Sequence, residues 1–210
     1  MTKRRVLVAW IGHSDLKAMA VAEGCALGAG ILETLGGSPP APGDSGPTKT
    51  LVSVEPFDEI RLLSNSPGPW NEAYRDWLGG DVTVIATELE RPTDYAAIFR
   101  AANSALAMLM NDRADHPLDL CIHLSPGTPA MAAVWLLLGK TRYAATFYET
   151  YQGRAWKTEI PFDLTLDVLP ELLRGPDARL AHLAAFAPHQ IDGFGDIIGD
   201  SQAIRVAVGR

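Results

Sequence analysis

Short runs of apolar residues recur along the chain, and most are followed by a segment with helical spacing. The runs expected to form strands are Val6–Ile11, Glu59–Leu63, Val82–Ala86 and Leu118–Leu124. The segments expected to form helices are Leu16–Leu27, Trp70–Leu78, Asp94–Met110 and Ala130–Leu138. The strands lack polar alternation, which is typical of a parallel sheet covered on both faces. The order of strands and helices therefore predicts a mostly parallel, doubly wound α/β sheet of the Rossmann-like type.

Two later apolar segments predict a different ending for the sheet. Ala145–Tyr151 and Trp156–Ile160 flank Gln152-Gly153-Arg154, a spacing typical of a terminal β-hairpin. Beyond Phe162, residues 169–173 and 177–186 have short helical patterns separated by Gly175-Pro176. We expect this part to form a short helical linker.

One stretch is rich in residues that interrupt regular structure. Residues 36–49 contain four glycines together with Pro39, Pro40, Pro42 and Pro47. This composition predicts a loop or disordered excursion without a regular element.

A strand–turn–helix pattern first occurs at Gly12, His13, Ser14 and Asp15, directly after the first apolar run. Ser14 is the expected N-cap of the following helix. The side chain of His13 has two interpretations, a solvated loop histidine or a ligand contact. Farther along the chain, Thr93 is the expected N-cap of the helix that begins at Asp94, whose carboxylate suits the first turn.

The same pattern returns after Leu118–Leu124, in the sequence Ser125-Pro126-Gly127-Thr128-Pro129-Ala130-Met131. Gly127 suits a tight turn, Thr128 suits a helix cap, and Pro129 falls at the first helical position, where its missing N–H costs nothing. Free amides at the start of this helix would point beyond the carboxyl end of a strand, where open α/β sheets bind ligands and anions are favoured. The alternative is a well-capped strand–helix junction without a ligand.

Composition narrows the function classes. The 210 residues are 47% hydrophobic and 20% charged, as in ordinary globular proteins, and the formal net charge is −7. This charge disfavours nonspecific binding to nucleic acid or an anionic membrane but allows a local pocket for one phosphorylated ligand. The two cysteines form no zinc motif, and no apolar stretch reaches the length of a membrane span or of a secretory signal. We expect a cytoplasmic protein without a membrane partner or a metal site.

Several catalytic and cofactor motifs fail on inspection. Gly139-Lys140-Thr141 lacks the P-loop glycine at the position of Val134, and Gly28-Ala29-Gly30 lacks the third dinucleotide-binding glycine at Glu33. The five histidines have no metal-ligand spacing, and Ser125 lies in no GxSxG motif. No catalytic residue and no cofactor is therefore assigned to these 210 residues.

The last stretch, Phe194-Gly195-Asp196-Ile197-Ile198-Gly199-Asp200-Ser201-Gln202-Ala203-Ile204, resembles the opening of the AAA+ ATPase domain of sigma-54-dependent transcriptional activators. The sequence stops at Arg210, before the Walker A loop that such a domain requires. The resemblance implies three parts: a sensing domain at 1–163, a helical linker at 164–192, and the truncated start of the ATPase domain at 193–210. ATP, magnesium, DNA and sigma-54 RNA polymerase would then be bound through domains that are missing here.

The strand, the motif Ser125 to Met131 and Ile160-Pro161-Phe162-Asp163 also resemble CARF domains (CRISPR-associated Rossmann fold). CARF domains joined to a sigma-54 AAA+ module occur in regulators of the RNA-terminal-phosphate-cyclase operon, the RtcR family. The resemblance implies a homodimeric sensor for an RNA-derived phosphate ligand, either a cyclic oligoadenylate or an RNA end with a 2′,3′-cyclic phosphate. The ligand-binding residues that it implies are Gly12, His13, Ser14, Asp15, Ser125, Pro126, Gly127, Thr128, Pro129 and Met131.

Asp15 fits this set poorly, because a carboxylate repels an anion; a hydrogen bond to a ribose hydroxyl or a helix-capping role would explain it. The basic residues near these loops in sequence are Lys17, Lys140 and Arg142. Each is either a ligand contact or a solvated charge at a helix end.

Two alternatives to a sensor remain open. Some CARF domains cleave cyclic oligoadenylate, and Ser14, Thr128 and Lys17 are the residues that would suit such a ring nuclease. No histidine–carboxylate pair requires that activity, so the enzyme reading is not favoured for this fragment. The second alternative is a protein-interaction module without a small ligand.

Overall fold

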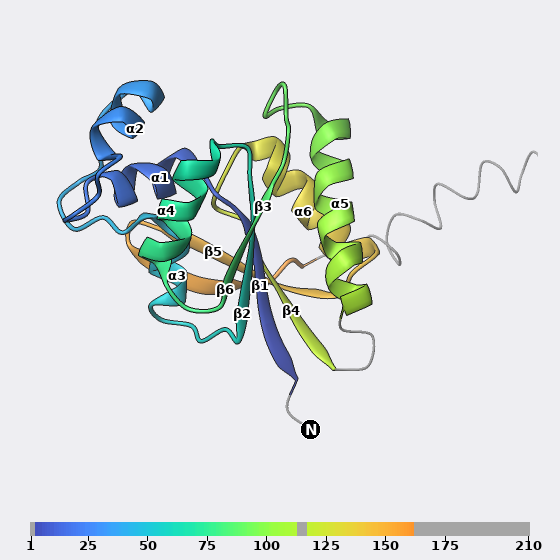
Figure 1. The fold of residues 1–210 in the computed structure, drawn as a ribbon. Helices are drawn as coiled ribbons and strands as arrows, with labels where there is room; N and C mark the ends of the chain where they lie inside the picture. Colours follow the sequence, from blue (N-terminus) through green and yellow to red (C-terminus); the bar gives the residue numbers. More distant parts are fainter. Residues whose placement is uncertain (1–2, 113–116, 162–210) are drawn as a thin grey trace, which may run out of the picture. The chain divides into compact units, whose positions relative to one another are not determined.

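The computed structural model describes residues 3–112 and 117–161, which form one six-stranded sheet with helices on both faces (Figure 1). The strands are β1 Arg4–Trp10, β2 Glu59–Ser64, β3 Val82–Ala86, β4 Leu118–His123, β5 Ala145–Tyr151 and β6 Arg154–Thr158. Their order across the sheet is β3-β2-β1-β4-β5-β6, and β1 to β5 are parallel whereas β6 is antiparallel to β5. The predicted doubly wound α/β fold with a terminal hairpin is confirmed. The predicted linker and ATPase segment lie outside the described residues.

The helices cover the two faces unequally. They are α1 His13–Ala20, α2 Gly28–Leu35, α3 Gly46–Val52, α4 Gly68–Leu78, α5 Tyr95–Asp112 and α6 Pro129–Thr141. Side chains of α1 to α4 share one core cluster, and those of α5 and α6 share the other, as Figure 1 shows on either side of the sheet.

The central strand β1 contributes to both clusters. Val8 and Trp10 lie in the cluster with α5 and α6, whereas Leu7 and Ala9 lie in the cluster with α1 to α4. All four are at most 1% exposed. Burial on both faces explains why this strand has no polar alternation, as the sequence predicted.

The predicted hairpin is confirmed, with a shift of its second strand. β6 begins at Arg154 rather than Trp156, directly after a two-residue turn. Gln152 and Gly153 have φ angles of 48° and 71°. Positive φ at both central residues is the geometry of a type I′ turn, whose twist matches that of antiparallel strands.

The helix predicted at Leu16–Leu27 is wrong in both bounds. α1 begins at His13 and ends at Ala20, and a separate helix, α2, follows from Gly28. Gly24 adopts a φ of 82°, which breaks the helical path between them. A side chain at Gly28 would lie 2.1 Å from the Ala20 carbonyl oxygen, so this close approach requires glycine.

The prediction that residues 36–49 hold no regular element is also wrong, because α3 begins at Gly46. Pro47 falls in its first turn, where a missing N–H is tolerated. The N–H of Gly46 donates to Asp44 Oδ1 (2.8 Å) and the N–H of Thr48 donates to Asp15 Oδ1 (2.8 Å). These two hydrogen bonds stabilise the start of α3 within a segment that is rich in glycine and proline.

Two predicted helix caps are corrected as well. Gly12, not Ser14, is the N-cap of α1, and Asp15 accepts the Gly12 N–H at 3.0 Å. In place of Thr93, Asp94 caps α5 by accepting the N–H groups of Ala96 and Ala97 at 2.9 and 3.1 Å. These hydrogen bonds lower the pKa of Asp94. Carboxylates replace hydroxyls at both helix starts.

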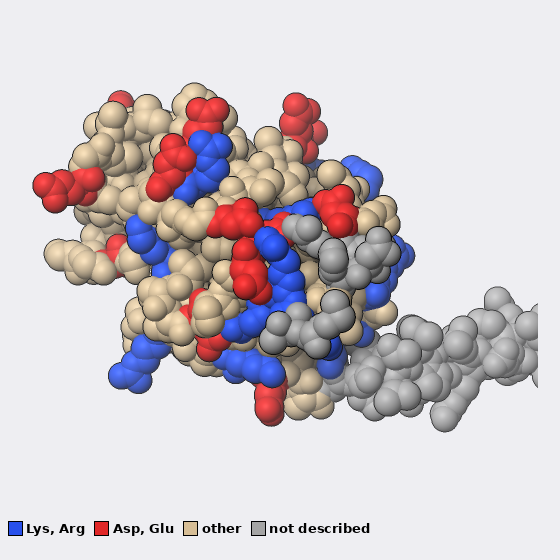
Figure 2. All heavy atoms as spheres, turned by 60° about the horizontal axis from the view of Figure 1, so that its bottom comes forward, with Lys and Arg blue, Asp and Glu red and all other residues tan. Residues whose placement is uncertain are grey.

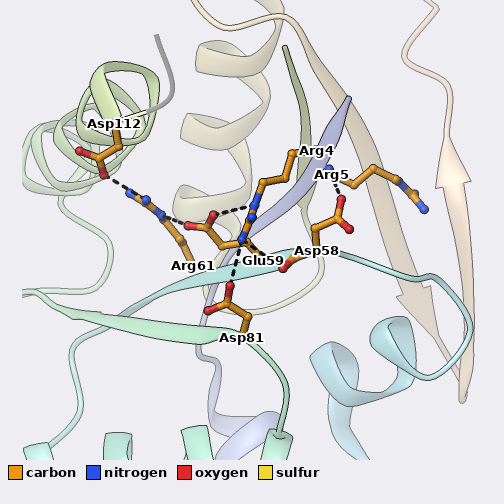
Figure 3. A network of polar contacts seen from close by, with 7 residues as sticks. All are labelled: Arg4, Arg5, Asp58, Glu59, Arg61, Asp81 and Asp112. Atoms are coloured by element: carbon orange, nitrogen blue, oxygen red, sulfur yellow. Dashed lines mark hydrogen bonds and ion pairs between the residues drawn. The ribbon is translucent and has the colours of Figure 1, made fainter. Parts of the chain in front are cut away.

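The amino-terminal edge of the sheet is held by ion pairs (Figure 3). The buried carboxylate of Glu59 contacts Arg61 Nε at 2.7 Å and Arg4 Nε at 3.3 Å. Arg4 also pairs with Asp81 and Arg61 with Asp112, each at 3.0 Å. Figure 2 shows this edge from outside, with acidic and basic side chains mixed across it. The network joins β1 and β2 to the residue before β3 and to the end of α5.

Among the described residues, no helix combines the length and the apolar character needed to cross a membrane.

Candidate functional site

The two predicted loops lie side by side at the carboxyl edge of the sheet. They follow β1 and β4, which are neighbouring parallel strands. α1 leaves β1 toward one face of the sheet and α6 leaves β4 toward the other. This is the topological switch point, where open α/β sheets bind ligands.

Close packing of two glycines brings these loops together. A side chain at Gly12 would lie 2.7 Å from the Gly127 backbone nitrogen. Gly127 has a φ of 94°, and a side chain there would lie 2.7 Å from Met131 Sδ. Neither position accepts a Cβ without a shift in the backbone or in Met131.

The start of α6 is capped as predicted. Thr128 Oγ1 accepts the Met131 N–H at 3.3 Å and donates to the Pro92 carbonyl at 2.7 Å. The Thr128 N–H points to Met131 Sδ at 3.4 Å, and Pro129 has no N–H. Most N–H groups at the start of α6 are therefore already hydrogen-bonded or missing. Fewer donors remain for an anion than the sequence predicted there.

The start of α1 differs. Among the described residues, the N–H groups of His13, Ser14 and Asp15 have no hydrogen-bond partner. These free donors and the helix dipole favour an anion at this end of the site.

Asp15 is fully buried, and its carboxylate contacts other protein groups. Its carboxylate accepts hydrogen bonds from the Gly12 N–H (3.0 Å), the Thr48 N–H (2.8 Å) and the Tyr74 hydroxyl (3.1 Å). Desolvation outweighs these bonds and raises the pKa of Asp15 to about 6. Of the two roles left open by the sequence, these contacts favour helix capping.

Thr150 of β5 holds the end of β4. Ser125 Oγ accepts the Thr150 N–H at 2.7 Å and donates to the Thr150 carbonyl at 3.1 Å. His123 Nε2 lies 3.1 Å from Thr150 Oγ1. Burial lowers the pKa of His123 to about 3, so this imidazole is neutral at physiological pH.

A cavity of about 260 Å³ lies over the two loops, and we call it the loop cavity. Nine of the ten predicted site residues line it, and Pro129 does not. The nine are Gly12, His13, Ser14, Asp15, Ser125, Pro126, Gly127, Thr128 and Met131. Asn65 and Ser66 also line it and were not predicted from the sequence. Their position directly after β2, at the same edge of the sheet, was a usable signal.

A second cavity of about 540 Å³ adjoins the first, and we call it the hairpin cavity. Residues 41–47 and the hairpin tip at residues 150–153 line it, together with Thr50 and Ser53 of the α3 region. Ser14 and Pro47 line both cavities. The sequence did not predict this second cavity.

The basic candidates lie elsewhere. No lysine or arginine of the described residues lines either cavity. Lys17 Nζ lies 3.4 Å from the Ser38 carbonyl, and Arg142 donates to Asn103 at 3.1 Å. Lys140 is in the last turn of α6, at the end away from the site.

Of the three residues that would suit a ring nuclease, Ser14 and Thr128 line the loop cavity, whereas Lys17 lines neither cavity. The Thr128 hydroxyl donates to the Pro92 carbonyl, and the Ser14 hydroxyl has no partner among the described residues. Within the described ranges, no group of three or more histidine, cysteine or acidic side chains is placed to bind a metal.

One comparison with known proteins supports the fold. No protein-family model matches the sequence, and no curated protein matches it. Among solved structures, the fold is similar to Enterococcus italicus Csm6 bound to cyclic hexa-2′-fluoro-hexa-dAMP, with a TM-score of 0.54 and 13% sequence identity. The match covers 88% of this chain and 50% of the Csm6 chain, so this chain spans about half of that structure. At such low identity the similarity concerns the fold, and it supports the CARF-like fold that the sequence resemblance implied.

Proposed function

We propose that this chain contains a CARF-type ligand-sensing domain that binds an RNA-derived phosphate ligand. The ligand is a cyclic oligoadenylate or an RNA end with a 2′,3′-cyclic phosphate. Two copies of the domain bind it across a homodimer, and binding controls an attached AAA+ ATPase of the sigma-54 activator type. The regulator would belong to the RtcR family and control RNA repair genes.

The observation that carries this proposal is the meeting of Gly12 and Gly127 at the switch point of the sheet. Two glycine turns from neighbouring strands approach too closely for side chains, and a cavity opens above them. Free N–H groups at the start of α1 favour a phosphate at this place.

The fold similarity supports the class of ligand. Csm6 was solved with a cyclic adenylate analogue, and its fold covers most of this chain. A nucleotide in the loop cavity of this chain would meet backbone donors and hydroxyls instead of lysine or arginine side chains. We therefore expect binding to depend weakly on salt, because few ion pairs with the ligand are formed.

Binding can be tested by isothermal titration of the 210-residue chain with cyclic tetra-adenylate and, separately, with RNA ending in a 2′,3′-cyclic phosphate. Gly12→Ala should weaken binding at least tenfold, because its methyl group would displace the Gly127 backbone. Gly30→Ala is the matched control, since a Cβ there meets nothing within 4 Å. Failure of the wild-type chain to bind either compound would refute the proposed ligand class.

Regulation needs a separate experiment. A ligand shifts the ATPase only if it binds one dimer arrangement better than the other. Deleting residues 1 to about 190 from the full-length activator should give constitutive ATPase activity. An inactive truncation would contradict autoinhibition by this domain but would not bear on the proposal that the domain binds a ligand. Sedimentation equilibrium of the 210-residue chain, with and without ligand, tests the homodimer.

A further inference from the structure

The hairpin cavity has a different chemistry from the loop cavity beside it. It is lined by Asp44 and Tyr151, and none of the described residues that line it is a cation. The two cavities share Ser14 and Pro47, so a single ligand can occupy both.

We infer that the hairpin cavity binds the nucleoside part of the ligand whose phosphate lies in the loop cavity, with the base on Tyr151 and its donor groups toward Asp44. This inference rests on the proposed function and adds the residues that select the nucleoside.

The two cavities differ in whether their carboxylate is free: both oxygens of Asp15 in the loop cavity accept hydrogen bonds, whereas Asp44 in the hairpin cavity uses only one among the described residues. Asp44 is the single charged residue among the described lining of the hairpin cavity. Its Oδ1 accepts the Gly46 N–H at 2.8 Å, and its other oxygen has no partner among the described residues. A free carboxylate oxygen repels phosphate and accepts hydrogen bonds from hydroxyl or amino groups, which a nucleoside provides.

Tyr151 supplies an aromatic surface at the tip of the hairpin. It is the last residue of β5, and its side chain is 67% exposed. Its hydroxyl accepts a hydrogen bond from Gln152 Nε2 at 3.3 Å. Aromatic side chains stack on the face of any base. An exposed ring beside a polar cavity therefore suits a nucleobase.

The backbone that carries this ring is held next to the loop cavity. Thr150, the residue before Tyr151, is bound through both its N–H and its carbonyl by Ser125, which lines the loop cavity. The type I′ turn at Gln152 and Gly153 fixes the other side. Base and phosphate sites are thus joined by short, hydrogen-bonded connections.

The experiment is isothermal titration of the 210-residue chain with cyclic tetra-adenylate. Tyr151→Leu should weaken binding by about 5- to 150-fold, the range for loss of one base–aromatic stack. Tyr151→Phe is the matched control and should bind within about twofold of wild type, because it keeps the stacking ring. Thermal unfolding of each unliganded variant establishes that it is folded.

Asp44→Asn tests the carboxylate without disturbing the loop, because the amide oxygen still accepts the Gly46 N–H. Its NH₂ group then faces the ligand's donors, so we expect binding to weaken by about tenfold. If the wild-type chain binds but Tyr151→Leu and Asp44→Asn bind equally well, the hairpin-cavity inference is wrong and the proposed function stands. If the wild-type chain binds neither cyclic tetra-adenylate nor RNA ending in a 2′,3′-cyclic phosphate, the proposed function fails and this inference fails with it. If it binds the RNA but not cyclic tetra-adenylate, the same variants are titrated with the RNA.

Discussion

The two edges of the sheet are stabilised in different ways. At the amino edge, Arg4, Glu59 and Arg61 form an ion-pair network with exposed acidic partners (Figure 3). At the carboxyl edge, Ser125, Thr150 and the capped start of α6 are held by hydrogen bonds between neutral groups. Glycine turns and two cavities lie there, and no lysine or arginine in the described part of the chain lines them.

This difference between the two edges agrees with the proposed ligand site. Ion pairs hold the amino edge because their opposite charges neutralise each other locally. A ligand site at the other edge needs donors that remain free, such as the first-turn N–H groups of α1. The buried charge of Asp15 is the exception at this edge, and its three hydrogen bonds compensate for part of its desolvation.

The largest effect is expected at the amino edge. Glu59→Gln removes the carboxylate between two arginines, and Arg61 is itself largely buried. Loss of one partner of a buried ion pair leaves an uncompensated charge, so the free energy of unfolding should fall by about 4 kcal/mol. Urea denaturation measures this. Asp81→Asn is the control, because the exposed Asp81–Arg4 pair should contribute about 0.5 kcal/mol. Equal decreases in the free energy of unfolding for the two variants would contradict the expected difference between the buried and the exposed ion pair.

At the carboxyl edge, His123 should control stability in acid. Its pKa is depressed to about 3 in the folded state by burial, so below the unfolded pKa of 6.5 the unfolded chain binds more protons. The contribution of His123 to stability should therefore decrease as pH falls below 6.5, by about 3 kcal/mol at pH 4. His123→Gln does not titrate and should lack this loss. Urea denaturation of both proteins at pH 7 and pH 4 gives the comparison, and identical acid losses would contradict it.

Asp15 should give a smaller effect of opposite sign. Its pKa is raised from 3.8 to about 6, so the folded chain binds the proton more tightly than the unfolded chain. The contribution of this group to stability is full below pH 3.8 and is lost as pH rises through 6, about 2 kcal/mol between pH 4 and pH 7. Asp15→Asn should remove this pH dependence, so that the variant shows the full loss of stability in acid that is due to His123. A pH profile unchanged by Asp15→Asn would show that Asp15 keeps its usual pKa.

The sequence predicted the architecture well because apolar runs report burial directly. β1 is apolar on both faces, and the structure buries both. The Thr128 cap was also predictable, since the N–H that its side chain accepts belongs to Met131, three residues later. Local chemistry was enough at these positions.

The errors have a common physical cause. α3 forms within a proline- and glycine-rich stretch because Asp15, 33 residues earlier, accepts the Thr48 N–H. The hairpin cavity depends on Tyr151 and residues 41–47 lying together, although they are distant in sequence. Contacts of this kind arise from tertiary packing and have no local pattern. The ten predicted site residues remain a prediction, even though nine of them line one cavity.

The smallest effect concerns the hydrogen bonds that replace ion pairs at the carboxyl edge. Ser125→Ala leaves the Thr150 N–H without its acceptor and should lower the free energy of unfolding by about 1 kcal/mol. Ser53→Ala, which loses one bond at an exposed helix end, should change it by less than about 0.5 kcal/mol. Urea denaturation at 0.05 and 1 M NaCl separates the two edges. The loss from Ser125→Ala should be the same at both salt concentrations because no charge is involved, whereas the contribution of Asp81 should shrink at high salt. A salt-dependent loss for Ser125→Ala would mean that charge also stabilises the edge that carries the proposed ligand site.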